Sequence, residues 1–294
     1  MEESLRDALR EAELTLRDAG VPSPRADAEL LAAHLLGVSR GRIAALALTG
    51  APAPDGYDDL VNERQQRVPL QHLTGVAYFR RVELAVGPGV FVPRPETETV
   101  AQLVIDHAQG LPAPKIVDLG TGSGAIAAAV ADEVPHAEVF AVELSDLAVA
   151  WARRNLSRFG VTLVQGDLTT ALPEHDGSFD IVVSNPPYIP EAAVPVEPEV
   201  AVHDPEMALY GGGADGMDLP RAAARSAARL LKPGGFFVME HAEVQAPWVA
   251  AFLRDTGGWT DISTHQDLSG RDRSTSAVRP SDVANASSVG TAAA

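Results

Sequence analysis

The chain has 294 residues, of which 46% are hydrophobic and 21% charged, so it is long enough for two domains and can bury a sizeable core. Its formal net charge of −17 argues against a broad nucleic-acid surface, because such binding rests on Lys and Arg contacts to phosphates, although a local basic groove stays possible. The absence of cysteine excludes disulfides, thiolate nucleophiles and cysteine-ligated metal centres.

The sequence carries no recognisable targeting or membrane segment. Its opening, MEESLRDALREAEL, has neither the basic flank nor the apolar run of a signal peptide. No later stretch is apolar over the length that a bilayer requires. We therefore expect a cytoplasmic protein without a membrane partner.

Residues 1–72 are predicted to form an all-helical domain. Leu5, Leu9 and Leu16 recur near helical spacing within residues 4–19, with charged residues between them. Glycine and proline separate this segment from the helices that follow. Those further helices are predicted over residues 25–36, 40–48 and 55–68.

Residues 73–96 show a different pattern, in which β-branched and aromatic residues alternate with others. Gly87, Pro88 and Gly89 form a turn signal within this stretch. We predict a β-hairpin that links the helical domain to the rest of the chain.

Residues 97–280 are predicted to form an α/β domain, because apolar strand-like runs alternate with helical ones in the rhythm of a doubly wound, mostly parallel sheet. Seven strands are expected, over residues 115–120, 137–143, 161–167, 179–185, 234–241, 259–265 and 274–279. The predicted helices cover residues 125–133, 145–159, 217–231 and 244–256. The last segment, 281–294, has no apolar period and is predicted to be a disordered tail.

The glycine-rich segment DLGTGSGA (118–125) follows the first of these strands and opens a helix, which is the setting of a nucleotide-type ligand site. The candidate ligand-binding residues in it are Gly120, Thr121, Gly122, Ser123 and Gly124. With an alanine in its last position, this loop also satisfies the dinucleotide pattern. The loop therefore leaves both NAD and S-adenosylmethionine open.

Three acidic side chains at strand ends narrow the choice of ligand. Asp118 would repel a pyrophosphate but pair with the α-ammonium of a methionine moiety, so it favours S-adenosylmethionine; the alternative is a turn-capping aspartate. Glu143 could hold a ribose diol, or be a solvated strand-end charge. Asp167 could accept the adenine amino group, or be an ordinary loop residue.

The most specific motif is Asn185-Pro186-Pro187-Tyr188, at the carboxyl end of the strand 179–185, where doubly wound sheets bind ligands. The two prolines have no N–H groups, so the segment offers carbonyl acceptors beside the amide oxygen of Asn185. A planar NH2 group thus finds acceptors for both hydrogens, which orients it for methyl transfer. Tyr188 could cover the planar group and exclude water; a rigid proline turn is the alternative.

Other catalytic signatures are missing from the sequence. His203, His241 and His265 lie far apart without metal-ligand spacing, so we expect no metal site. There is also no G-x-S-x-G elbow and no P-loop lysine.

Over nearly its whole length the sequence resembles the HemK/PrmC family of release-factor glutamine methyltransferases. VPRPETE ahead of the glycine loop is the distinguishing segment, because NPPY also occurs in DNA adenine and other amino methyltransferases. The segments that carry the resemblance are LTGVAYFRR (73–81), VFVPRPETE (90–98), DLGTGSGAIA (118–127), SNPPYIP (184–190), GGFFVMEHAEVQ (234–245) and DLSGRDRST (267–275).

The resemblance implies a class I methyltransferase-like seven-stranded sheet and a cytoplasmic enzyme of translation termination. By it, Gly120–Gly124 and Glu143 hold S-adenosylmethionine, and Asn185–Tyr188 grip the glutamine of the GGQ loop of peptide chain release factors, which becomes N5-methylated. The helical domain would engage that protein substrate. Leu168 departs from the family, which often has an aromatic residue near adenine at this position.

Three alternatives to this function remain open. The motif Asn185–Tyr188 could serve adenine in nucleic acid, which would require base flipping and phosphate contacts that the acidic charge disfavours. It could also serve another protein glutamine. Finally, the chain could be a noncatalytic module that keeps S-adenosylmethionine as a structural ligand or sensor. We expect no direct nucleic-acid binding.

Overall fold

A computed structural model of the chain describes residues 3–281, and the predicted tail beyond position 281 lies outside the described residues. The described chain forms two compact units. The first contains residues 3–76, 86–88 and 195–203, and the second contains residues 77–85, 89–194 and 204–281.

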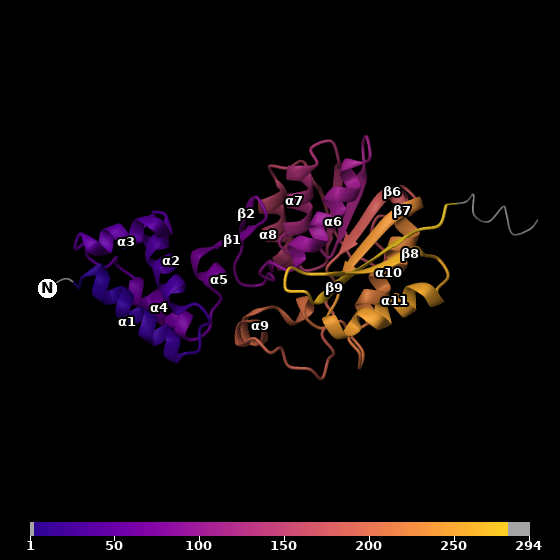
Figure 1. Cartoon of the computed structure of the whole chain (residues 1–294). Helices are drawn as coiled ribbons and strands as arrows, with labels where there is room; N and C mark the ends of the chain where they lie inside the picture. The colour runs from indigo at the N-terminus through magenta and orange to yellow at the C-terminus, as the bar shows by residue number, and fades with distance from the viewer. Residues whose placement is uncertain (1–2, 282–294) are drawn as a thin grey trace, which may run out of the picture. The chain divides into compact units, whose positions relative to one another are not determined.

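The first unit is helical, as the sequence predicted. Its elements are α1 (Leu5–Asp18), α2 (Pro24–Leu36), α3 (Arg40–Leu48), α4 (Tyr57–Gln65), α5 (Leu70–Thr74) and α9 (Pro198–His203). The first four match the predicted helices within a few residues, and Figure 1 shows them in indigo and purple. The short helices α5 and α9 were not predicted.

Local chemistry explains where α1 begins and which face it buries. The side chain of Ser4 accepts a hydrogen bond from the backbone N–H of Asp7, which satisfies one of the unpaired donors of the first turn. Leu5, Leu9 and Leu16 have no exposed surface and pack in the core of the helical unit. The apolar spacing seen in the sequence is therefore the buried face of the helix.

A buried ion-pair cluster joins α9 to the rest of the helical unit. Arg64 donates from Nε to Asp27 at 2.8 Å and from Nη2 to Glu199 at 2.9 Å, and only 6% of its side chain is exposed. Arg67 binds the other oxygen of Glu199 at 2.5 Å. Burial alone would raise the pKa of Glu199, but hydrogen bonds from Arg67 and Arg64 outweigh it and lower the pKa to about 2. The segment 195–203, which we had placed within residues 97–280, thus packs with the helices.

The predicted β-hairpin is present, but it reverses at a different place. Strands β1 (Val76–Phe79) and β2 (Val82–Ala85) form a two-stranded sheet whose reversal is at Arg80 and Arg81. Arg80 has a φ of 53°, and an ion pair with Glu133 at 2.5 Å holds its guanidinium. The predicted turn at Gly87–Gly89 instead follows the second strand.

The second unit is a mixed α/β structure built on a seven-stranded sheet in the order β5-β4-β3-β6-β7-β9-β8. The strands are β3 (Lys115–Leu119), β4 (Glu138–Glu143), β5 (Thr162–Gln165), β6 (Phe179–Ser184), β7 (Leu231–Glu240), β8 (Thr260–Gln266) and β9 (Asp272–Val278). The helices are α6 (Thr97–Gln109), α7 (Ala125–Glu133), α8 (Asp146–Leu156), α10 (Asp218–Leu230) and α11 (Ala246–Asp255).

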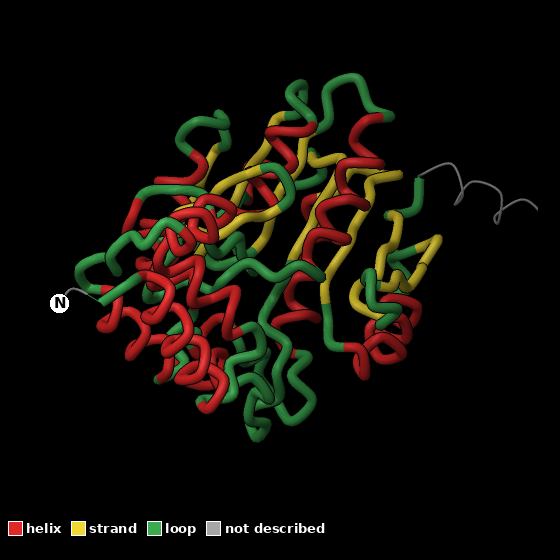
Figure 2. Tube along the Cα trace, turned by 60° about the vertical axis from the view of Figure 1, so that its left-hand side comes forward, coloured by secondary structure: helices red, strands yellow, loops and turns green. Residues whose placement is uncertain are grey.

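The topology of this sheet predicts a ligand site between β3 and β6. Strands β5, β4, β3, β6 and β7 are parallel, and β9 runs antiparallel to both of its neighbours. The chain moves outward from β3 in both directions, and right-handed crossovers then put α7 and α10 on opposite faces. Figures 1 and 2 show helices flanking the sheet. Such a reversal of strand order leaves a crevice at the carboxyl ends of the two strands.

The central strands are buried on both faces, which explains why their sequences are continuous apolar runs. Val117, Leu119, Val182 and Phe237 have no exposed surface and belong to one hydrophobic core. This rigid core supports the loops that leave the carboxyl edge.

Within the described residues, no single helix is long and apolar enough to cross a membrane. Among residues 3–281, one consecutive pair of helices, α2 and α3, reaches the required length and composition together, but it is bent by 89° at its break.

Candidate active site

The glycine loop and the Asn-Pro-Pro-Tyr segment leave neighbouring strands at the same edge of the sheet. Leu119 at the end of β3 is in register with Ser184 at the end of β6. The buried Ser184 hydroxyl donates a hydrogen bond to the Leu119 carbonyl at 2.7 Å. Two segments 65 residues apart in sequence therefore begin side by side.

The glycine loop adopts a conformation that requires glycine. Gly120, Gly122 and Gly124 have φ values of 76°, 57° and 86°, in the region that other residues rarely occupy. A Cβ atom on Gly124 would also lie 2.9 Å from Cγ of Leu156. The loop is fixed to the sheet because the N–H groups of Gly120 and Thr121 both donate to the carbonyl of Val142 at 2.9 Å.

Asp118 is a buried carboxyl group with one unused oxygen. Its Oδ2 accepts a hydrogen bond from the Thr121 hydroxyl at 2.6 Å, whereas Oδ1 has no hydrogen bond to any described residue. Burial raises the pKa of Asp118 from 3.8 to about 7 against the opposing hydrogen bonds from the Thr121 hydroxyl and the Ala127 backbone, and the charge of Glu143 adds to the rise. A buried acceptor without a partner is rare in folded proteins, and a cationic ligand group would satisfy it.

Glu143, at the end of β4, organises the loop from the other side. Its Oε2 accepts the N–H of Gly122 at 2.8 Å, and its Oε1 accepts the N–H groups of Leu144 and Ser145, each at 2.9 Å. An ionised carboxylate has about four acceptor positions. Three of these positions are occupied by backbone N–H groups, so Glu143 can accept one further hydrogen bond from a hydroxyl group while it holds the backbone.

Asp167 and Leu168, which we predicted to bind the cofactor, differ in how far they are buried. Asp167 is exposed, and its Oδ1 accepts both the N–H of Thr169 at 2.8 Å and its hydroxyl at 2.7 Å. This is a loop-closing role, which leaves Oδ2 available. Leu168 is half-buried and packs against the core beneath the sheet edge. Ser123, the remaining loop residue, is buried, and its carbonyl accepts a hydrogen bond from Asn155 at 2.8 Å.

Asn185 is held by a contact that the sequence did not suggest. Its Nδ2 donates to the hydroxyl of Thr97, the first residue of α6, at 3.3 Å. Because the nitrogen is used here, the amide oxygen is the atom left to accept a hydrogen bond. Pro186 is buried and Pro187 half-buried beside it, and neither has an N–H group.

Tyr188 is fixed at both ends. Its hydroxyl donates to Oε1 of Glu240, the last residue of β7, at 3.4 Å. Its carbonyl accepts a hydrogen bond from Nε2 of the buried Gln245 at 2.8 Å. Burial, followed by the nearby charge of Glu240, raises the pKa of Tyr188, so its hydroxyl stays protonated at neutral pH.

Three residues of this site were not among our candidates: Thr97, Glu240 and Gln245. They lie in VPRPETE and GGFFVMEHAEVQ, so the segments were singled out although these side chains were not. Burial raises the pKa of Glu240 from 4.5 to about 7, while a hydrogen bond from Thr97 and the charge of Arg273 oppose this rise. In the sequence, the available signal was the presence of these polar residues inside the two motifs. The structure shows that all three are buried.

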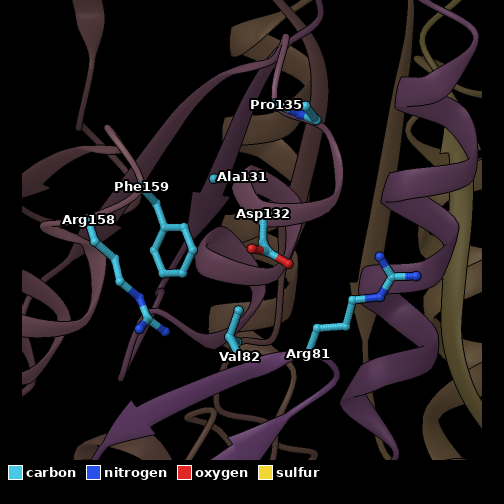
Figure 3. Close-up of a pocket in the computed structure, with 7 residues that line it drawn as sticks. All are labelled: Arg81, Val82, Ala131, Asp132, Pro135, Arg158 and Phe159. Carbon is cyan, nitrogen blue, oxygen red and sulfur yellow. The ribbon is translucent and has the colours of Figure 1, made fainter.

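A separate hollow lies at the far end of α7 from the glycine loop. Figure 3 shows Asp132 between Arg81 on one side and the Phe159–Arg158 pair on the other, with the Arg158 guanidinium 4.7 Å from the centre of the Phe159 ring. The hollow contains none of the predicted site residues. It is lined by Arg81, Val82, Ala131, Asp132, Pro135, Arg158 and Phe159.

The three histidines noted in the sequence have structural contacts. His241 is fully buried between the carbonyl of Ala242 and the hydroxyl of Thr275, at 2.9 and 2.8 Å. His265 contacts the hydroxyl of Ser276 at 2.7 Å, and His203 contacts the carbonyl of Gln66 at 3.5 Å. Over residues 3–281, no three His, Asp or Glu side chains gather in a way that could hold a metal ion.

The seven-stranded sheet, with its glycine loop after β3 and Asn-Pro-Pro-Tyr after β6, defines a class I methyltransferase. Residues 81–202 match the methyltransferase small domain family. A solved structure of the 16S rRNA N2 G1207 methyltransferase of T. Thermophilus, in complex with AdoMet and guanosine, shares the fold with a TM-score of 0.50 and 22% identity, over 69% of this chain and 49% of that one.

Sequence relatives narrow the class to one family. Residues 7–75 match the PrmC N-terminal domain. The release factor glutamine methyltransferase of Streptomyces coelicolor is 53% identical over 88% of this chain and 92% of its own length. The chain belongs to the release factor glutamine methyltransferase family. A 4-amino-L-phenylalanine/4-methylamino-L-phenylalanine methyltransferase of Streptomyces pristinaespiralis is 42% identical over 89% of this chain and 91% of its own length.

Proposed function

We propose that this protein transfers the methyl group of S-adenosylmethionine to the side-chain amide nitrogen of the glutamine in the GGQ loop of release factors. The observation that carries the proposal is the amide of Asn185, whose nitrogen is bound to Thr97 and whose oxygen is left to accept a substrate N–H. The 53% identity to a release factor glutamine methyltransferase supports the same substrate. The reaction would take place in the cytoplasm, in translation termination.

The residues of the glycine loop fit S-adenosylmethionine. The unused Oδ1 of Asp118 is a buried acceptor suited to the α-ammonium group of the ligand. Gly120 to Gly124 would allow its methionine portion to approach the backbone, and Glu143 would accept a ribose hydroxyl. Asp167 and Leu168 would border the adenine. When bound, S-adenosylmethionine supplies a methyl group on a positively charged sulfur.

The Asn-Pro-Pro-Tyr segment orients the acceptor amide. The oxygen of Asn185 and a backbone carbonyl of Pro186 or Pro187 accept the two N–H hydrogens, so the nitrogen presents its lone pair to the methyl group. The ring of Tyr188 covers the planar amide and keeps water out. The rate acceleration then comes from orientation, because the weakly basic amide nitrogen is held in line with the methyl group rather than deprotonated in advance. The bond from the methyl carbon to nitrogen forms as its bond to sulfur breaks, and the methylated nitrogen gives up one of its two protons to solvent.

The helical unit is proposed to recognise the release factor. Its match to the PrmC N-terminal domain supports this role, as does the assignment of all predicted catalytic residues to the other unit. The acidic charge of the chain favours a protein partner over nucleic acid.

Mass spectrometry of a release factor incubated with the protein and S-adenosylmethionine tests the proposal. We expect the peptide that contains GGQ to gain the mass of one methylene group, located on the glutamine. A release factor whose GGQ glutamine is replaced by glutamate is the matched control and should gain nothing.

Methylation of an aromatic amine is the second candidate, because a relative of 42% identity is named for 4-amino-L-phenylalanine. The aniline NH2 group is planar like an amide, so the same acceptors would fit it. Adenine in nucleic acid and glutamine in another protein satisfy the same geometry. The experiment therefore includes free 4-amino-L-phenylalanine and an adenine-containing oligonucleotide in parallel; methylation of either one, without methylation of the release factor, would reassign the substrate.

A further inference from the structure

A second glycine-rich loop, residues 211–216, lies against the backbone of the Asn-Pro-Pro-Tyr segment. The N–H of Ile189 donates to the carbonyl of Leu209, and the N–H of Gly211 donates to the carbonyl of Ile189, each at 2.9 Å. The loop has the sequence GGGADG, and α10 begins two residues after it. The segment that carries the proposed acceptor groups is therefore supported by this loop.

Two glycines of the 211–216 loop make the close approach possible. A Cβ atom on Gly211 would lie 2.6 Å from the carbonyl oxygen of Pro187 and 2.8 Å from Cα of Tyr188. Gly216 has a φ of 71°, and a Cβ atom on it would overlap with the carbonyl oxygen of Tyr188. These neighbours are backbone atoms, which cannot turn aside as a flexible side chain can. A larger residue at either position would therefore displace the Tyr188 backbone.

Gln245 joins this loop to the Asn-Pro-Pro-Tyr segment. It is 1% exposed, and its Nε2 donates to the carbonyl of Tyr188 at 2.8 Å and to the carbonyl of Asp215 at 3.0 Å. Its Oε1 accepts the N–H of Ala242 at 3.0 Å. Both ends of the amide are thus in use, and its orientation is fixed, because half a turn would place the oxygen against two carbonyl oxygens.

These contacts determine the direction in which the Tyr188 side chain leaves the backbone. Peptide groups are planar, so the two peptide planes beside a residue set the direction of its Cα–Cβ bond. At Tyr188, Gly211 packs against the preceding plane, and Gln245 holds the carbonyl of the following one. The hydroxyl at the far end of the ring is bound separately to Glu240. The ring is therefore fixed from its backbone as well as from its hydroxyl.

We propose that Gln245 is a positioning residue, which acts through the carbonyl of Tyr188 to aim the aromatic ring at the acceptor amide. The inference rests on the proposed function, in which this ring covers the amide. A displacement of about 1 Å in such a group costs on the order of 100-fold in rate. Gln245 is bound to segments that follow β6 and β7, whereas the loop 118–125 and Glu143 belong to β3 and β4. The rate should therefore depend on Gln245 and cofactor affinity should not.

The first test is Gln245→Met, which nearly keeps the length of the side chain but removes its hydrogen bonds. With release factor and S-adenosylmethionine, we expect kcat to fall on the order of 10- to 100-fold. The Kd for S-adenosylmethionine, measured by calorimetry, should stay within about twofold. Val249→Ala is the control for lost stability, because Val249 lies one turn further along, in α11, and is fully buried in the core. It should lower the melting temperature and leave kcat, measured well below that temperature, near the wild-type value.

Two glycine variants provide a second route should Gln245→Met fail to fold. Gly216→Ala and Gly213→Ala introduce the same backbone strain, since their φ values are 71° and 70°. In the first variant the new methyl group meets the carbonyl of Tyr188, whereas in the second its nearest neighbours are all atoms of the Asp218 side chain. We expect Gly216→Ala to lower kcat on the order of 10-fold or more and Gly213→Ala to retain it.

A double-variant cycle measures whether Gln245 acts through the tyrosine ring. Tyr188→Ala removes the ring and should itself be slow. In that background, Gln245→Met should lower kcat by no more than about twofold further, because the group that it positions is already gone. A merely structural role predicts the same loss in both backgrounds, in step with the melting temperature.

The outcomes separate this inference from the proposed function. Wild-type kcat in both Gln245→Met and Gly216→Ala, together with a slow Tyr188→Ala, would overturn the role of Gln245 and leave the covering role of the ring in place. Full activity of Tyr188→Ala would overturn that covering role itself. Equal losses of kcat in Gly216→Ala and Gly213→Ala would contradict a role for the contact with Tyr188.

Discussion

Replacing Asp118 by Asn should have opposite effects on stability and on ligand binding. Asp118 is 1% exposed, and its Oδ1 has no hydrogen bond to any described residue. Its charge is therefore unfavourable in the protein alone and favourable once a cationic ligand arrives. We expect Asp118→Asn to unfold less easily than the wild type without ligand and to bind S-adenosylmethionine more weakly.

The magnitude follows from the pKa. Because folding raises the pKa of Asp118 from 3.8 to about 7, the folded protein holds the proton more tightly than the unfolded chain does. The penalty is absent below the unfolded value, grows as the pH rises, and is complete above the folded value. It amounts to about 4 kcal/mol at most. The new NH2 group lacks a buried partner, which leaves a net gain of about 1 to 3 kcal/mol.

Binding should change in the other direction. A hydrogen bond to a charged group contributes about 1.5 to 3 kcal/mol, so its loss weakens the affinity for S-adenosylmethionine roughly 10- to 150-fold. Urea unfolding at pH 8 and pH 5.5 measures the stability, and the gain should shrink at the lower pH. Titration calorimetry measures the affinity.

Glu143→Gln is the matched control for Asp118→Asn. Glu143 accepts three backbone N–H groups, so this variant should lose stability as well as affinity. An Asp118→Asn protein that is less stable than the wild type at pH 8 and binds S-adenosylmethionine equally well would refute both the electrostatic argument and the place of the ligand.

Two further predictions concern the scaffold. Gly124→Ala combines a φ of 86° with a Cβ atom 2.9 Å from Leu156, and should cost about 1 to 3 kcal/mol in thermal unfolding. Gly177→Ala, with a φ of 65° and no neighbour within 4 Å, should cost less; equal losses would show that the contact contributes nothing. Arg64→Ala leaves buried carboxylates without their partner and should cost about 3 to 5 kcal/mol in urea unfolding. Arg25→Ala, from an exposed pair, should cost about 1 kcal/mol or less, and a similar loss in both arginine variants would contradict a buried cluster.

The helices and strands that could be predicted are those whose apolar pattern can be recognised within a short stretch of sequence. Buried parallel strands such as Lys115–Leu119 are continuous apolar runs between turn signals, so their positions followed from the sequence. The helix Thr97–Gln109 was missed although its signal was present, since Val100, Val104 and Ala108 recur at helical spacing and are buried. The first five residues of VPRPETE, up to Glu96, were assigned to the predicted linker, and no helix was predicted after them.

The contacts that complete the site could not be predicted, because they join residues that are far apart in the sequence. Asn185 and Thr97 are 88 residues apart and meet only because α6 and β6 pack together. The position of Glu199 among the helices likewise depends on Arg64 and Arg67, more than 130 residues earlier. Motifs identified the chemistry of the site, whereas the hydrogen bonds that orient its side chains required the fold.

The turnover of Asn185→Ala on a release factor tests the central claim most directly. Single-turnover methylation of the GGQ glutamine, followed by mass spectrometry, should slow on the order of 10²- to 10³-fold relative to the wild type. The far-ultraviolet circular dichroism spectrum and the melting temperature should stay close to those of the wild type, because Asn185 is only half-buried. Wild-type turnover in this variant would contradict the assignment of Asn-Pro-Pro-Tyr as the segment that grips the acceptor amide.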